Sequence, residues 1–195
     1  MGAASALPAI VDKAAAVARI DAHFSSWLVR LAAASRGNLV SIELVYVAFW
    51  NYPFRASRRG TARTWTGHLA IEPIKRITAV LSHGVRPEAV PESATLLPVA
   101  EPPPADEVQR VLFWEALARR RRDRPDSVTL DTPSVLYVPY WIGYLRGRNW
   151  DLCPVDATTG KIDLAIKDAL VEALGALDRV SAEEATITPG GESKP

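Results

Sequence analysis

The chain of 195 residues has little of the chemistry that marks a disulfide framework or a metal site. Its one cysteine, Cys153, excludes an internal disulfide and a zinc site made of clustered cysteines. Its three histidines leave little material for a histidine-rich metal centre. The sequence therefore predicts no metal and no other cofactor.

The chain also lacks long apolar runs and an excess of charge of either sign. No stretch of about 18 uncharged apolar residues occurs, which a membrane-spanning helix would need. The N-terminal residues lack the basic start and uninterrupted apolar core of a signal peptide. With 23 basic and 22 acidic residues, no global field points to nucleic acid or to a membrane. We expect a cytoplasmic protein, with peripheral membrane association left open.

Familiar catalytic signatures are missing as well. The sequence contains no HExxH, GxSxG, GxGxxG or phosphate-binding loop pattern. Cys153 has no histidine near it in the sequence, as an activated nucleophile would need, so we interpret it as a buried core thiol. Enzymatic activity is therefore the less favoured class, and no catalytic residue is assigned.

The sequence does contain alternating signals for helices and strands. Apolar residues at helical spacing predict helices over about 8–35, 73–84, 106–125 and 163–178. Runs rich in β-branched and aromatic residues predict strands over 39–50, 61–71, 136–142 and 150–155, the first of them bending or ending at Pro53.

Two segments of the chain are similar to each other. Residues 44–55 read LVYVAFWNYPFR, and residues 135–146 read VLYVPYWIGYLR. Identical residues at one constant offset form four pairs: Tyr46 with Tyr137, Val47 with Val138, Trp50 with Trp141, and Arg55 with Arg146.

The order of predicted elements also repeats, which indicates an internal duplication. We therefore predict an α+β fold in which two similar helix–strand–hairpin–strand–helix units pack into one pseudo-twofold body. The predicted division is a first repeat at 1–84, a proline-rich connector at 85–105, a second repeat at 106–178 and a disordered tail at 179–195.

The second unit resembles a small β-meander module. Its Tyr-x-Pro-x-Trp strand at 137–141 and its Thr-Gly-Lys turn at 159–161 carry the likeness. Such modules occur in assorted bacterial proteins, some of which also carry zinc ribbons. The resemblance implies a strand–turn–strand fold and no particular activity, and the zinc-ribbon cysteines are absent here.

The repeated aromatic residues are the first candidate binding residues. Tyr46 and Trp50, with their counterparts Tyr137 and Trp141, either anchor the core of each half or flank a shared groove. Such a groove, at the junction of the repeats, would accept a peptide, a quinone-like ring or a lipid.

Arginines in the two predicted hairpins are the second set of candidates. Arg55, Arg58 and Arg59 alternate with aromatic residues in the first hairpin, and Arg146 and Arg148 do so in the second. Arginines beside exposed aromatic rings can hold phosphates and stack on bases. Alternatively they form an ordinary solvated surface whose aromatic neighbours belong to the core.

These features favour a non-catalytic binding or assembly subunit of a larger complex, with a protein partner or a second copy of the chain. The first alternative is a nucleic-acid-binding module that uses the arginine-aromatic hairpins. The second is a small enzyme whose site lies between the repeats.

Overall fold

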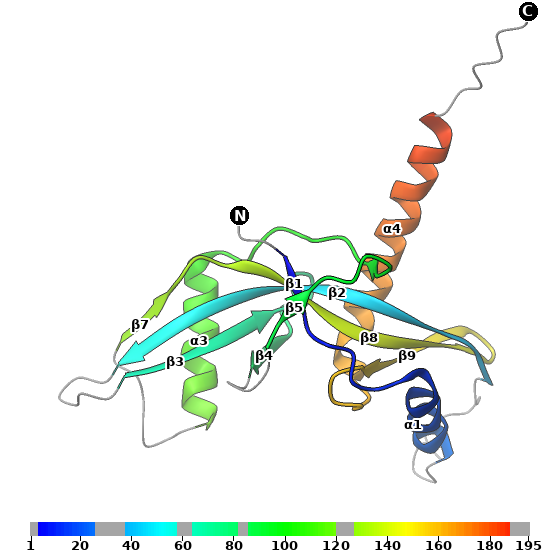
Figure 1. The fold of residues 1–195 in the computed structure, drawn as a ribbon, viewed down its shortest axis with the longest axis horizontal. Coiled ribbons are helices and arrows are strands. Elements are labelled where there is room, and N and C mark those ends of the chain that lie inside the picture. Colours follow the sequence, from blue (N-terminus) through cyan, green and yellow to red (C-terminus); the bar gives the residue numbers. More distant parts are fainter. Residues whose placement is uncertain (1–3, 26–37, 58–63, 82–85, 120–126, 188–195) are drawn as a thin grey trace, which may run out of the picture.

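The computed structural model describes residues 4–25, 38–57, 64–81, 86–119 and 127–187. Their fold is mixed α+β, with one large mixed sheet and three long helices (Figure 1). No helix in these ranges combines the length and the apolar character needed to cross a bilayer. The helices are α1 (Lys13–Ser25), α3 (Ala105–Arg119) and α4 (Lys167–Ile187), the last preceded by the short 3-10 helix η1 (Leu164–Ile166).

Two long antiparallel strands form the centre of the sheet. Strand β2 (Asn38–Ser57) pairs with β8 (Ser134–Arg146), with Val47 directly opposite Val138. Strand β7 (Ser127–Leu130) continues this pairing along the far end of β2. Both long strands are rich in β-branched and aromatic residues, which fit a pleated and largely buried surface.

Each long strand turns back into a hairpin at its C-terminal end. Strand β3 (Thr64–Ile71) returns along β2, and β4 (Thr78–Leu81) pairs with β3. Strand β9 (Trp150–Asp156) returns along β8. Figure 1 shows these hairpins at opposite ends of the sheet, with α3 near the first and α1 near the second.

Three strands of two residues each complete the sheet. Strand β1 (Ser5–Ala6) runs parallel to β8, and β6 (Thr95–Leu96) runs parallel to β2. Strand β5 (Glu88–Ala89) pairs with β1. The proline-rich segment therefore lies along the sheet, and both halves of the chain contribute strands to it.

Alternation along the long strands divides the core between the two faces of the sheet. Val47 and Val138 belong to the face covered by α4, through side chains such as Leu170. The other face carries Tyr46 and Tyr137, and α3 packs against it through Val108 and Leu112 at one end. At the other end, α1 covers Leu145, Cys153 and Val155 with Ala16 and Ile20.

The helix expected over 73–84 is wrong within the described residues, because Thr78–Leu81 form strand β4. The Glu72 carboxylate accepts hydrogen bonds from the backbone N–H groups of Ile74 and Lys75, at 2.9 and 2.7 Å. Arg76 then takes φ 59°, a left-handed conformation that ends any helix. The chain reverses there, and Thr78 starts back along β3.

Two expected boundaries also differ from the structure. Strand β2 continues through Pro53 to Ser57, because the Pro53 carbonyl still accepts a hydrogen bond from the Asp131 N–H, at 2.9 Å. Helix α4 continues past residue 179 to Ile187, so that part of the expected disordered tail is helical. Its Ala- and Glu-rich sequence has high helix propensity. Residues 188–195 lie outside the described part.

The last helical segment is capped by Asp163, whose carboxylate accepts a hydrogen bond from the Ala165 N–H at 3.2 Å, at the N-terminus of η1. The helix expected from Asp106 is confirmed as far as Arg119, since α3 begins at Ala105, and residues 120–125 lie outside the described part.

Candidate functional site

The two repeated tyrosines lie together in the interior. Tyr46 and Tyr137 are both buried and belong to the same apolar cluster, on the face that α3 covers. Burial raises the pKa of each phenol above its ordinary value. Both rings therefore serve to hold β2 and β8 together in the core.

The two repeated tryptophans each donate a hydrogen bond to the segment that leads into a helix. The Trp50 indole N–H donates to the Ala100 carbonyl at 2.9 Å, just before α3. The Trp141 indole N–H donates to the Val11 carbonyl at 2.7 Å, just before α1. Trp50 is buried and Trp141 is half-buried, so each ring joins a long strand to a helix lead-in segment.

Changing either tryptophan to phenylalanine tests this role. Trp50→Phe and Trp141→Phe keep an aromatic ring but leave one carbonyl without its donor. We expect each to lower the free energy of unfolding by about 1–3 kcal/mol. Urea denaturation of the two variants and the wild type measures this. A loss of less than about 0.5 kcal/mol in both variants would show that neither hydrogen bond contributes to stability.

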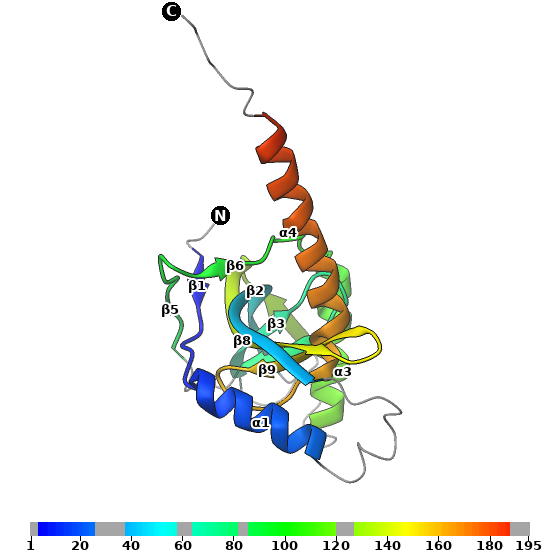
Figure 2. The ribbon, with the colours of Figure 1, turned by 90° about the vertical axis from the view of Figure 1, so that its right-hand side faces the viewer.

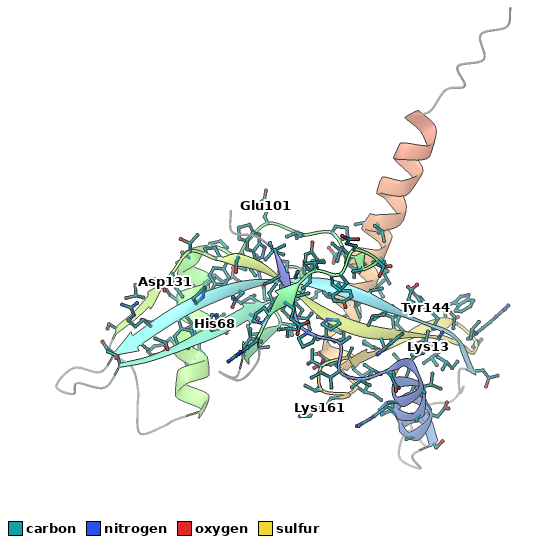
Figure 3. The ribbon with its side chains drawn as sticks, viewed as in Figure 1. Lys13, His68, Glu101, Asp131, Tyr144 and Lys161 are labelled. Carbon is teal, nitrogen blue, oxygen red and sulfur yellow. The ribbon has the colours of Figure 1, made fainter. Side chains whose placement is uncertain are left out.

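Arg55 lies on an exposed polar part of the sheet at the end formed by β7, β2 and β3. Its cross-strand neighbours are Thr129 and Thr66, and both are exposed. His68 and Asp131 lie at the same end (Figure 3), where His68 Nδ1 is 3.2 Å from the Asn51 side-chain oxygen. Sequence reasoning missed this surface because its residues come from three separate strands.

The aromatic residues of that first hairpin are separated from Arg55. Tyr52 is buried and donates its hydroxyl hydrogen bond to the Pro103 carbonyl at 3.1 Å. Phe54 is half-buried on the same face, and its ring lies where a side chain at Gly67 would otherwise be. Arg58 and Arg59 lie outside the described residues. In the described part of this hairpin, the arginine and the aromatic rings therefore project from opposite faces of the sheet.

The second hairpin keeps an arginine and an exposed aromatic ring together. Arg146 and Trp150 are the last pair of the β8–β9 ladder, and both are exposed. The Arg146 guanidinium lies over the Trp150 indole, 5.5 Å from the ring centroid. Arg148 is exposed in the turn between them. We call Arg146, Arg148 and Trp150 the hairpin tip.

Acidic side chains near the hairpin tip are bound to other partners. Asp151 forms an ion pair with Lys167, and Glu43 accepts a hydrogen bond from the Tyr144 hydroxyl. Figure 3 shows Tyr144 near this end of the sheet, far from His68 and Asp131. Within the described ranges, no acidic side chain pairs with Arg146 or Arg148.

The remaining reactive side chains show no catalytic arrangement in the described part of the chain. Cys153 is fully buried beneath α1, and this burial raises the pKa of its thiol to about 11, which disfavours the nucleophilic thiolate. Glu72 is buried, but both carboxylate oxygens accept backbone hydrogen bonds. Among the residues the structure describes, no group of three or more His, Cys, Asp or Glu side chains is placed to hold a metal ion.

Comparison with known proteins adds no family to these observations. The chain matches no protein-family model, no curated protein and no solved structure.

Proposed function

We propose that the protein is a non-catalytic binding module of the cytoplasm, built from two copies of one unit, that assembles with a protein partner through α4. In this proposal the two units together form the central sheet. Helix α4 has no counterpart in the first half and supplies the docking surface. The alternative of a small enzyme has no side-chain arrangement in its favour among the described residues.

The register of the central strands supports the duplication. Val47 and Val138 match in the sequence repeat and also lie directly opposite each other in the ladder. A twofold relation between antiparallel strands requires such a self-paired position at its centre. On either side, Tyr46 is opposite Pro139 and Ala48 is opposite Tyr137, so each aligned residue of β2 is opposite the counterpart of the residue equally far on the other side of Val47.

The short strands support it independently. Strand β1 pairs with β8 at Leu136 and Tyr137, and β6 pairs with β2 at Val45 and Tyr46, which are the aligned positions. The next residue repeats the contact. The Leu7 N–H donates to the Tyr137 carbonyl at 2.8 Å, and the Leu97 N–H donates to the Tyr46 carbonyl at 2.9 Å.

In this arrangement the short strand before each long strand pairs with the long strand of the other unit: β1 with β8, and β6 with β2. The two tryptophan hydrogen bonds follow the same rule, because Trp50 lies in the first half and binds the segment before α3. Such reciprocal exchange explains how two units too small to cover an apolar strand alone form one stable sheet.

The observation that carries the docking role is a pair of exposed apolar side chains at the start of the last helical segment. Ile166 and Leu170 are buried against the sheet, whereas Leu164 and Val171 are 52% and 53% exposed. Leu164 lies in η1 and Val171 in the first turns of α4, with the exposed Asp168 between them in the sequence. Figures 1 and 2 show the C-terminal half of α4 extending beyond the sheet. Exposed apolar side chains at the base of a helix that extends beyond the sheet are suited to contact with a protein partner.

The variant Val171→Glu tests this proposal. A carboxylate at the centre of an apolar contact should weaken association by at least about tenfold, because burying it without a partner costs more than 1.4 kcal/mol. Purification of tagged wild-type and variant protein from the native cell, followed by quantitative mass spectrometry, measures the co-purifying proteins.

Ile10→Glu is the matched control, because Ile10 is an equally apolar and even more exposed side chain away from α4. We expect the control to retain every protein that Val171→Glu loses. Identical sets of proteins with all three baits would contradict the proposal. Thermal melts of all three proteins verify that the fold is unchanged.

A further inference from the structure

The hairpin tip has a second property that the docking role of α4 does not use. Trp150 is 63% exposed. The Gly147 N–H donates to the Asn149 carbonyl at 3.2 Å and closes the turn, so Arg146 and Trp150 face each other as the last pair of the ladder. The Arg146 guanidinium lies over one face of the exposed indole, 5.5 Å from its centroid.

We propose that the hairpin tip is a contact site for single-stranded nucleic acid. Trp150 stacks on one base, and Arg146 and Arg148 bind the phosphates on either side of it. Asp151 pairs with Lys167 and Glu43 with Tyr144, so among the described residues no acidic side chain neutralises the two arginines of the tip. A nucleic acid offers both partners that the tip needs, a base that can stack on the indole and adjacent phosphates that can bind the arginines.

The composition of the tip favours this ligand over a membrane. A membrane anchor needs several apolar side chains at the tip, whereas the turn here is Gly147, Arg148 and Asn149. A single strand is favoured over a duplex, because stacking on an indole requires a base whose face is free. The first hairpin does not offer this combination in its described part, where Tyr52 and Phe54 project from the face opposite Arg55.

The probe is a fluorescein-labelled oligo(dT) of 20 nucleotides, titrated with the full-length protein by fluorescence anisotropy at several salt concentrations. Two phosphate contacts predict a slope of about −1.4 for the logarithm of the binding constant against the logarithm of salt concentration. Trp150→Ala should weaken binding by about 5- to 150-fold without changing this slope. Arg148→Gln should reduce the slope by about 0.7.

Trp114→Ala is the matched control, because Trp114 on α3 is similarly exposed, at 60%, and its ring makes an edge-to-face contact with Phe113. We expect it to bind like the wild type. Trp150→Phe keeps a smaller stacking surface and should bind with intermediate affinity. It provides a second test in case the alanine variant does not fold. Val171→Glu should bind the oligonucleotide normally, so this inference and the docking role of α4 can fail separately.

Three results would overturn the inference. One is the absence of saturable binding by the wild-type protein in low salt. Another is an equal loss of affinity in Trp114→Ala and Trp150→Ala. The third is Trp150-dependent binding to phosphatidylserine vesicles without binding to the oligonucleotide, which would assign the tip to a membrane instead.

Discussion

Replacing Leu97 by alanine is expected to lower the free energy of unfolding by about 2–5 kcal/mol, as for a leucine in the centre of a core. Leu97 lies in the proline-rich segment, yet it is only 1% exposed and packs in the cluster beneath α4 with Val45 and Val47. Its removal leaves a cavity next to the central strand. Urea denaturation measures the loss as a lower midpoint at an unchanged slope.

Two further variants determine what this loss means. Leu7→Ala changes a buried leucine of the same cluster that corresponds to Leu97 in the proposed duplication, so we expect a loss of similar size. Val99→Ala changes a neighbour that is 41% exposed, so we expect a loss of less than about 1 kcal/mol. If Leu97→Ala were as mild as Val99→Ala, the segment would be a simple linker and not part of the core. A large difference between Leu7→Ala and Leu97→Ala would argue against the duplication.

The protein is expected to lose stability steeply above pH 9, and Cys153 is a main reason. Burial, and to a lesser extent the charge of Asp151, raises the pKa of the thiol to about 11. Because the folded state holds this proton more tightly than the unfolded chain, the contribution is complete below about pH 9 and is lost by about pH 11. A pKa difference of about 2 corresponds to about 2–3 kcal/mol. Urea unfolding at intervals from pH 8 to 11 measures the decline.

Cys153→Ala is the control for this pH dependence, since alanine cannot ionise. The variant is expected to be less stable at pH 8 because it lacks the buried sulfur, but to decline less between pH 9 and 11. Part of the decline should remain, because burial and the nearby Asp163 carboxylate also hold the pKa of the Tyr140 phenol well above its ordinary value. Parallel curves for the variant and the wild type would show that the thiol does not contribute.

Local sequence patterns predicted much of the secondary structure but not the partners of the strands. The run from Leu39 to Trp50 predicted a buried strand, and the apolar character of both its faces is explained by helices on both sides of the sheet. The helical spacing of Ile74, Ile77 and Leu81 was misleading. Cross-strand pairing with β3 and the turn at Arg76 depend on residues that such a pattern does not include.

The candidate site could be predicted only in part for the same reason. The sequence identified Arg55, Arg146 and Arg148 together with neighbouring aromatic residues, but neighbours along a strand point to opposite faces. Which aromatic ring shares a face with which arginine depends on the cross-strand register. Trp150 therefore becomes a stacking partner of Arg146 through the β8–β9 ladder, with the three turn residues between them in the chain.

The sequence by itself determined the fold class and the composition: an α+β chain with one inert thiol, nearly balanced charge and two similar aromatic strands. Helix spacing, turn residues and β-branched runs act over a few residues, so they can be recognised in any short window. Only the tertiary structure decided that β1 and β6 pair with the long strand of the opposite half, and which tryptophans are buried. Those outcomes depend on contacts between residues about 50 to 130 positions apart, which no local pattern encodes.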